Sequence, residues 1–260
     1  MMDHVTLQDH ISIVLMQPRL PENIGAVARA MSNMGFKDLV VVNPKNFDLN
    51  RISTMATHEA SSVVEHIRLF DNLNDALSTF HYTIGTTARL GRQRQERITP
   101  KQLGNHILPL AKENNIALLF FSVYRGLCNE DIDFCDILVN IPTAEFASLN
   151  LAQAVMVLCY ELFTAATDFT SETFIPSLAT RHELETMYEH LKDALLVIDF
   201  INPQNPDYWM KNFRRFFSRF QLRAKEVKLI MGICRQIHWY GGFRFQQGLN
   251  QHQQCVKYKE

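Results

Sequence analysis

Two stretches of the sequence combine polar side chains with the start of a helix, an arrangement suited to binding a ligand. The first spans residues 21–31 and holds Asn23, Gly25 and Arg29, and the second spans residues 141–155 and holds Ser148 and Asn150. A polar loop that enters an amphipathic helix presents unpaired backbone N–H groups and a few fixed side chains. Because two such loops occur far apart in the chain, they predict one composite site.

Each of these residues also has a purely structural interpretation. Asn23, Ser148 and Asn150 are residue types that favour helix N-caps in any protein, and Arg29 could be a solvated arginine on a helix face. Gly25 and Gly85 could be turn glycines, or they could allow close approach of the backbone to a cofactor. Capping and ligand contact can coexist, so both interpretations stay open at this point.

Short apolar runs alternate with longer helical patterns through the first part of the chain. Runs this short and rich in Ile, Val and Phe indicate strands that are buried on both faces of a parallel sheet. The sequence therefore predicts an α/β domain. The predicted strands are residues 11–16, 39–42, 82–85, 116–121 and 137–141.

The second part of the chain has the pattern of helices alone. A stretch rich in Thr and Ser separates it from the α/β part, and such a change in composition is typical of a domain boundary. Thr180 and Glu183 then form a capping-box sequence that predicts a helix start. We expect an α/β domain at residues 1–165, a linker at 166–179 and a helical extension at 180–260.

Composition limits the function classes. The 260 residues are 47% hydrophobic and carry a formal net charge of -1, so any basic surface for nucleic acid must be local. The five cysteines form no CxxC pair, which favours reduced, mostly buried thiols. No apolar stretch is long enough for a membrane span, and no leader is recognisable. A cytoplasmic location is expected.

Several common chemistries lack their sequence signatures. The ten histidines form no HExxH or paired Cys/His spacing, so no metal site is expected. The chain has neither GxGxxG nor GxxxxGK[ST], which excludes the usual nucleotide-binding loops. No Ser, His and Asp constellation can be assembled from the sequence order.

Three segments resemble the signature motifs of SpoU-type RNA 2'-O-methyltransferases of the SPOUT class. They are the Asn23-x-Gly25-x-x-x-Arg29 segment, the segment from Gly85 to Arg89, and residues 141–151 with Ser148 and Asn150. Their order and spacing both match the family. Within it, the chain is most similar to the bacterial enzymes that methylate the ribose of a cytidine or uridine in the tRNA anticodon loop. This similarity extends nearly end to end.

The resemblance implies a SPOUT-type parallel sheet with a deep C-terminal trefoil knot, followed by a small all-α domain. It also implies a homodimer, S-adenosylmethionine as cofactor and tRNA as substrate. Arg29 would act in catalysis, as an orienting and electrostatic group because arginine stays protonated, together with Asn23, Ser148 and Asn150. The cofactor would lie against Thr86, Thr87, Leu119, Phe121, Gly126, Ile141 and Leu149.

The chain departs from the family in the middle cofactor motif. Phe121, Ser122 and Val123 occupy the positions of the family's glycine, arginine and glutamate. If that glycine has a positive φ, Phe121 costs about 1–2 kcal/mol, and the loss of one charged hydrogen bond adds about 1.5–3 kcal/mol. Two hypotheses therefore remain. The first is an altered but active methyltransferase, and the alternative is a catalytically silent RNA-binding dimer of the same fold.

Two basic segments are candidates for RNA contact. Arg89, Arg92, Arg94 and Arg97 follow the second motif. From residue 209 to 228 the sequence holds seven basic residues and the single acid Glu226. We expect the phenylalanines there to be core and the arginines to face outward, with Arg215, Arg219 and Arg223 on one face if the helix continues, suited to phosphates. A merely solvated basic face is the alternative. The phenylalanines are Phe213, Phe216, Phe217 and Phe220.

Overall fold

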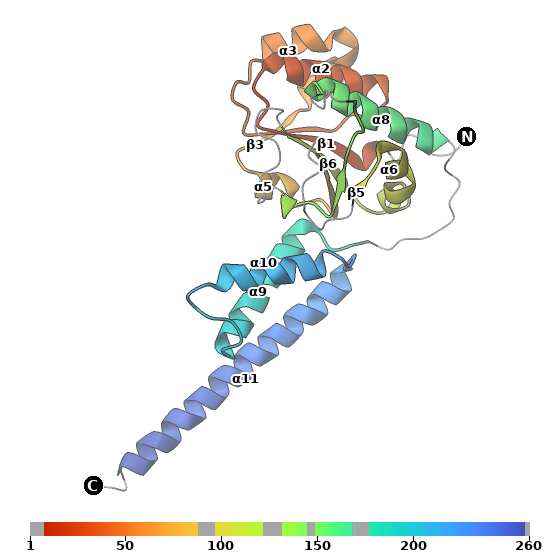
Figure 1. Ribbon diagram of the computed structural model, residues 1–260. Coiled ribbons are helices and arrows are strands. Elements are labelled where there is room, and N and C mark those ends of the chain that lie inside the picture. The colour runs from red at the N-terminus through yellow and green to blue at the C-terminus, as the bar shows by residue number, and fades with distance from the viewer. Residues whose placement is uncertain are drawn as a thin grey trace. The chain divides into compact units, whose positions relative to one another are not determined.

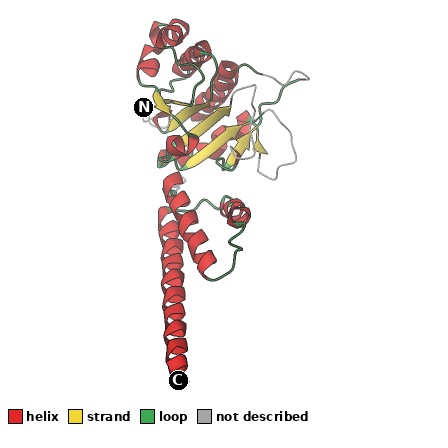
Figure 2. Ribbon diagram, turned by 90° about the vertical axis from the view of Figure 1, so that its left-hand side faces the viewer, coloured by secondary structure: helices red, strands yellow, loops and turns green. Residues whose placement is uncertain are grey.

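The computed structural model of the chain describes residues 8–87, 97–121, 132–144, 149–167, 169 and 177–257, and only the backbone of residues 242 and 244–257. The chain forms two compact units, Met1–Ser177 and Leu178–Glu260. The first unit is an α/β structure and the second is helical (Figures 1 and 2). This division confirms the predicted α/β part with a parallel sheet and the predicted helical part after it.

In its described residues the first unit is built on a seven-stranded sheet with the order β3-β2-β1-β6-β4-β7-β5. Every pair of neighbouring strands in it is parallel. The five predicted strands are all present, although β4 extends one residue further and β7 ends two residues earlier than predicted. Two short strands at the edges, β3 and β5, were not predicted. The strands are β1 (Ile11–Met16), β2 (Leu39–Val42), β3 (Arg68–Phe70), β4 (Tyr82–Thr86), β5 (Arg97–Ile98), β6 (Ile116–Phe121) and β7 (Ile137–Val139).

Helices cover both faces of this sheet (Figure 1). On one face, Val14, Val40 and Leu119 pack with residues of α5 (Leu73–Leu77) in one apolar cluster. Alternate residues such as Leu15 and Phe120 point to the opposite face and are 0–1% exposed. There, α8 lies between α2 and α6, and α2 also packs on α3. These four helices are α2 (Pro21–Asn33), α3 (Leu49–Ala56), α6 (Pro100–Ile107) and α8 (Leu151–Thr167).

Short helical turns complete the connections of the first unit. They are η1 (His58–Ala60), α4 (Ser61–Glu65) and η2 (Leu110–Lys112).

Residues 178–257 of the second unit, the part that the structure describes, form three helices. They are α9 (Arg181–Val197), α10 (Pro206–Phe217) and α11 (Ala224–Lys257). The capping box at the start of α9 is confirmed, because Thr180 N donates to Glu183 Oε2 (2.9 Å) and Glu183 N donates to Thr180 Oγ1 (3.2 Å). A small core forms around Met187 and Tyr188, to which α10 contributes Met210 and α11 contributes Val227.

The cysteines whose side chains are described are free thiols. Cys135, Cys159 and Cys234 are all buried, and burial raises the pKa of both Cys159 and Cys234. Cys128 and the Cys255 side chain lie outside the described part of the chain. No helix in the described ranges combines the length and the apolar content that crossing a membrane requires.

Candidate active site

The carboxyl ends of β1, β4, β6 and β7 meet at one edge of the sheet. Because all the strands are parallel, the loops that follow them leave from this edge, where ligands bind in open α/β sheets. The strand register places Met16 beside Phe121, Gly85 beside Leu119 and Thr86 beside Val139. The loop that follows β1 leads into α2, so both predicted motif regions start from the same edge.

Hydrogen bonds fix the ends of β4 and β7 at this edge. Thr86 Oγ1 donates to the Leu119 carbonyl oxygen (3.1 Å), and Thr87 N donates to the Val139 carbonyl oxygen (2.9 Å). Asn140 Nδ2 donates to the Thr87 carbonyl oxygen (2.8 Å). The hydroxyl of Thr86 is therefore committed within the protein, and its described role is to hold two strand ends in place.

Asn140 was not among the predicted site residues. It follows the buried strand β7 directly, and its own backbone N–H donates to the Ile98 carbonyl oxygen (3.1 Å). A polar residue at the carboxyl end of a buried parallel strand is the sequence signal that identifies such a position.

Phe121 lies in strand geometry and is not strained. It is the last residue of β6, is 9% exposed and packs in the cluster with Leu119 and Cys135. It is not among the residues with positive φ. The backbone penalty considered for a phenylalanine at this position therefore does not arise, whereas Ser122 and Val123 lie outside the described residues.

Gly25 and Gly85 are required by packing within the protein. A Cβ atom on Gly25 would overlap the Ile52 carbonyl oxygen and approach Met55 Cβ to 2.8 Å, so this glycine brings α2 close to α3. A Cβ atom on Gly85 would lie 2.5 Å from Cys135 Sγ. Neither residue has positive φ, so the turn interpretation was wrong for both, and packing accounts for each without a cofactor.

Asn23 lies in the first turn of α2 and does not cap it. The N-cap is Leu20, which offers no side-chain hydrogen bond. Asn23 is half-buried, and its side chain has no hydrogen-bond partner among the described residues. The capping alternative was therefore wrong for Asn23, and its amide is available for a ligand.

Arg29 projects from α2 into solvent and is exposed. Its electrostatic effect reaches Glu59, which η1 presents beside α2. The pKa of Glu59 is lowered mainly by the Thr57 hydroxyl, which donates to Glu59 Oε2 (2.8 Å), and to a smaller extent by the positive charge of Arg29. The guanidinium has no ion-pair partner within the described residues, so it remains available to an anion.

Asn150 caps α8, as its structural interpretation predicted. Its Oδ1 accepts from Ala152 N (2.9 Å), and its own N–H donates to Gln153 Oε1 (3.1 Å). Because α8 packs beside α2 (Figure 1), the helices that carry Asn150 and Arg29 are neighbours. Asn150 is exposed, so capping leaves its amide group accessible.

The remaining predicted residues divide into three groups. Ile141 and Leu149 are half-buried residues at the two ends of the segment that enters α8, and Ile141 lies beyond β7 rather than within it. Arg97 belongs to β5, where it pairs with Leu138. The predicted residues outside the described ranges are Arg89, Arg92, Arg94, Gly126 and Ser148.

The basic segment of the second unit differs from its prediction. Phe213 and Phe217 pack on the core, but Phe216 and Phe220 are 51% and 52% exposed. α10 ends at Phe217 and Ser218 is its C-cap. The helix therefore does not continue, and Arg215, Arg219 and Arg223 do not share one helical face.

Arg214 faces inward, contrary to the outward orientation expected for the arginines. Its Nη1 lies 2.5 Å from Glu185 Oε1, and its guanidinium stands 4.4 Å from the centre of the Tyr188 ring. Arg215 and Arg219 are exposed.

Comparison with known proteins decides the family. The model of the SpoU rRNA Methylase family matches residues 10–160. The chain belongs to the SpoU methylase family. A second model, the C-terminal domain of the tRNA methyltransferase TrmJ, matches residues 182–252. One match lies within each structural unit of this SpoU-family chain.

Relatives cover most of this SpoU-family chain. The tRNA (cytidine/uridine/adenosine-2'-O-)-methyltransferase TrmJ of Pseudomonas aeruginosa is 35% identical over 241 residues, which are 88% of this chain and 93% of the relative. The tRNA (cytidine-2'-O-)-methyltransferase TrmJ of Methanocaldococcus jannaschii is 36% identical, over 85% of this chain and 96% of the relative. The crystal structure of TrmJ from Z. mobilis ZM4 superimposes with a TM-score of 0.75 at 26% identity, over 87% of this chain and 98% of that one.

The described residues contain no group of three or more His, Cys, Asp or Glu side chains that could hold a metal ion. The sheet edge instead combines apolar side chains, backbone groups and amides. Such a set suits the flat ring of an organic ligand better than a metal ion.

Proposed function

We propose that this protein transfers the methyl group of S-adenosylmethionine to the ribose 2'-oxygen of a cytidine or uridine in the tRNA anticodon loop. The observation that carries the proposal is the similarity to TrmJ proteins, which extends over both units and 88% of the chain. A match to the first unit alone would support RNA methylation without indicating tRNA.

The described groups fit the adenosyl part of the cofactor. Phe121, Ile141 and Leu149 supply apolar surface at or beyond the strand ends, and the backbone near Thr87 supplies hydrogen-bonding groups. Adenine is commonly held by such a combination of apolar contact and a few polar groups. When bound, S-adenosylmethionine supplies an electrophilic methyl group. The predicted cofactor contacts of Thr86, Leu119 and Gly126 belong to the same proposal.

The protein's own contribution to the reaction is mainly orientation. Holding two reactants in a reactive geometry can supply about 7–11 kcal/mol of the barrier. The ribose hydroxyl must also lose its proton, which passes to a neighbouring phosphate or to water. Arg29 stabilises the developing negative charge or that phosphate without giving up its own proton. Asn23, Ser148 and Asn150 position the ribose and Arg29.

The silent alternative depended in part on backbone strain at Phe121, and Phe121 shows no such strain. Since this residue lies in ordinary strand geometry, its side chain can contribute apolar surface at the strand end without distorting the backbone. The proposed activity therefore takes precedence over the silent alternative.

The proposal includes a homodimer and a trefoil knot, as the family resemblance implies. In support of the dimer, the outer face of α8 is apolar: Tyr160 is 52% exposed, Phe163 is 40% exposed, and Met156 and Val157 are half-buried. An apolar helix face of this kind favours contact with another protein surface. The family resemblance alone supports the knot.

The proposal assigns different work to the parts of the chain. Residues 1–165 carry the reaction, residues 166–179 link the parts, and residues 180–260 add affinity for tRNA. Because tRNA is a polyanion, exposed arginines contribute through its phosphates. The proposed contacts are Arg89, Arg92 and Arg94 near the active site, with Arg215 and Arg219 in the helical extension. We propose a cytoplasmic location, where tRNA is found and the free thiols stay reduced.

Two measurements test this function. Isothermal titration of the protein with S-adenosylmethionine is expected to give saturable heat, and unmodified tRNA is expected to gain a ribose methyl group that mass spectrometry maps to a cytidine or uridine. Arg29→Ala is expected to lower methyl transfer at least 100-fold, in the range for loss of one charge-stabilising group. No detectable heat at millimolar cofactor, with tRNA binding retained, would favour the silent alternative.

A further inference from the structure

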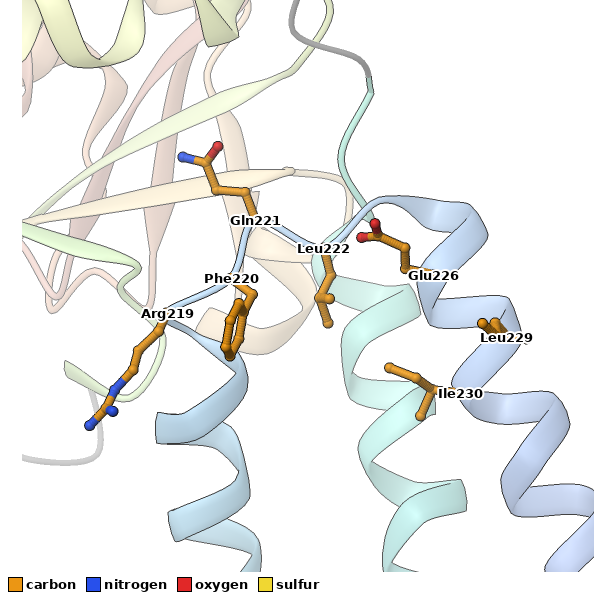
Figure 3. A pocket seen from close by; sticks show the side chains of 7 residues that line it. All are labelled: Arg219, Phe220, Gln221, Leu222, Glu226, Leu229 and Ile230. Carbon is orange, nitrogen blue, oxygen red and sulfur yellow. The ribbon is translucent and has the colours of Figure 1, made fainter.

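A hollow opens on the second unit between the end of α10 and the start of α11 (Figure 3). Its volume is about 600 Å³, which lies within the range of roughly 300–1,000 Å³ that is typical of ligand pockets. Leu222 and Ile230 are half-buried and pack against the core cluster, so they connect the hollow to the core of the unit. Phe220 and Leu229, which are 52% and 66% exposed, also line it.

The backbone around this hollow is held in place. Ala179 N donates to the Leu222 carbonyl oxygen (2.8 Å), and Leu178 forms an antiparallel bridge with Arg223. Phe220 N donates to the Phe217 carbonyl oxygen (2.9 Å), which closes the turn after α10. The Phe220 ring is therefore presented from a fixed backbone, so little order has to be gained when a ligand binds.

The charge around the hollow favours an anionic partner. From residue 208 to residue 257 the sequence holds ten Lys or Arg residues and the single acid Glu226. Arg215, Arg219 and Arg223 are exposed, and none of the three has a carboxylate partner for its guanidinium in the described structure. Arg214, in contrast, pairs with Glu185. The arginines nearest the hollow are thus available to phosphates.

The polar side chains of the hollow suit a nucleobase. Gln221 carries an amide that can both donate and accept, and Glu226 carries a carboxylate. One oxygen of that carboxylate, Oε2, accepts from Arg223 N (2.8 Å), which leaves Oε1 accessible. An exposed aromatic ring next to an arginine is a combination that single-stranded nucleic acids use, with the base stacked on the ring and the phosphate near the guanidinium.

We propose that this hollow binds an unpaired nucleotide of tRNA, with its base stacked on Phe220, its edge near Gln221 and Glu226, and its phosphate near Arg219. This inference rests on the proposed function for the identity of the RNA. It adds a base-stacking site to a surface whose expected contacts were with phosphates alone.

The test measures binding of the full-length protein to an unmodified tRNA transcript by fluorescence anisotropy at several salt concentrations. Phe220→Ala is expected to raise the Kd about 10-fold, which corresponds to about 1.4 kcal/mol. Phe220→Leu keeps the apolar bulk but has no ring face, so its Kd is expected to rise as much as that of Phe220→Ala. Phe220→Tyr keeps the ring, and its Kd is expected to stay within about twofold of that of the unsubstituted protein.

Two controls separate stacking from charge and from general surface effects. Arg219→Ala is expected to reduce the slope of log Kd against log salt by about 1, whereas Phe220→Ala leaves that slope unchanged. Tyr208→Ala removes an aromatic ring that is 61% exposed in the first turn of α10 and does not line the hollow, and it is expected to leave the Kd unchanged. For duplex RNA of equal length, the Kd of Phe220→Ala is expected to equal that of the unsubstituted protein.

Three results would overturn the proposal. They are unsubstituted-like tRNA binding by Phe220→Leu, an equal loss of duplex binding in Phe220→Ala, and a shift to smaller species in sedimentation of Phe220→Ala with tRNA binding unchanged. The last result would assign the hollow to a second copy of the chain.

Methyl transfer is assayed separately, so the two proposals fail differently. A protein that shows Phe220-dependent tRNA binding but transfers no methyl group supports the nucleotide site and refutes the enzyme. A protein that methylates tRNA, and whose tRNA binding is unchanged in Phe220→Leu, supports the enzyme and refutes the nucleotide site.

Discussion

The two units of the chain bury their apolar side chains to different extents. In the first unit, aliphatic residues such as Val14, Val40 and Leu118 are 0% exposed within a sheet that helices cover on both faces. In the second unit a small core forms around Met187 and Tyr188, whereas Phe216 and Trp239 are about half exposed or more. The first unit therefore depends on close packing, and the second keeps much of its apolar and aromatic surface accessible to partners.

This difference suggests how the work is divided. A closely packed sheet can hold loops at its carboxyl edge in a fixed geometry, as orientation of two reactants requires. A helical unit with exposed aromatic and basic side chains suits recognition of a flexible, charged substrate. Both tryptophans, Trp209 and Trp239, lie in the second unit, so tryptophan fluorescence reports on that unit alone and the two can be followed separately.

The largest expected effect is that of Gly25→Ala in the first unit. The new Cβ atom would overlap the Ile52 carbonyl oxygen, so α2 and α3 must separate, and we expect a loss of about 3 kcal/mol in the free energy of unfolding. Urea denaturation followed by far-UV circular dichroism measures this loss. The tryptophan-monitored transition should stay in place.

Gly232→Ala is the matched control in the second unit. Nothing lies within 4 Å of a Cβ atom at this position of α11, so the substitution should stabilise the helix by about 0.5–1 kcal/mol. If Gly25→Ala and Gly232→Ala changed the free energy of unfolding equally little, the contrast in packing between the units would be refuted.

An intermediate effect is expected for Arg214→Ala in the second unit. This substitution removes the contact with Glu185 and the stacking over Tyr188. Arg181 still pairs with Glu185, at 3.1 Å, so the loss should be about 1–2 kcal/mol. Tryptophan fluorescence during urea denaturation measures it. Arg215→Ala, one position along the same helix, should leave the midpoint unchanged but weaken tRNA binding, and the opposite pattern would contradict the inward orientation of Arg214.

A smaller destabilisation than for Gly25→Ala or Arg214→Ala is expected for Asn150→Ala, which removes the cap of α8 and should cost about 1 kcal/mol. Asn150→Ser should retain the cap and therefore the stability. Methyl transfer by the serine variant then separates capping from ligand contact, because a loss of activity at full stability indicates that the amide also contacts the substrate. Asn23→Ala should change activity without changing stability, since Asn23 does not cap α2.

Much of the first unit was predictable because its strands are apolar throughout. The runs at β1, β2 and β6 match their predicted bounds, since strands buried on both faces carry a strong signal in the sequence. Strands β3 and β5 were missed because they contain three and two residues, include Arg68 and Arg97, and lie at the sheet edges. Edge strands this short have no apolar periodicity.

The roles of single residues depended on neighbours that the sequence does not place. Gly25 is explained by Ile52, and Arg214 is explained by Glu185, across a separation of 29 residues. Phe220 was expected in the core because helical spacing was extended past Ser218, where α10 ends. The motif pattern predicts Asn150 and Arg29 as site residues, whereas the Asn140 contact with Thr87 depends on strands that meet only in the folded sheet.

The bridge between Leu178 and Arg223 ties the entry of the helical unit to the turn before its longest helix. This backbone contact lies entirely within the helical unit and involves no residue before Leu178. Joining residues 178–260 to another domain at this boundary would keep that contact, and we expect the helical unit to hold its own entry in place there.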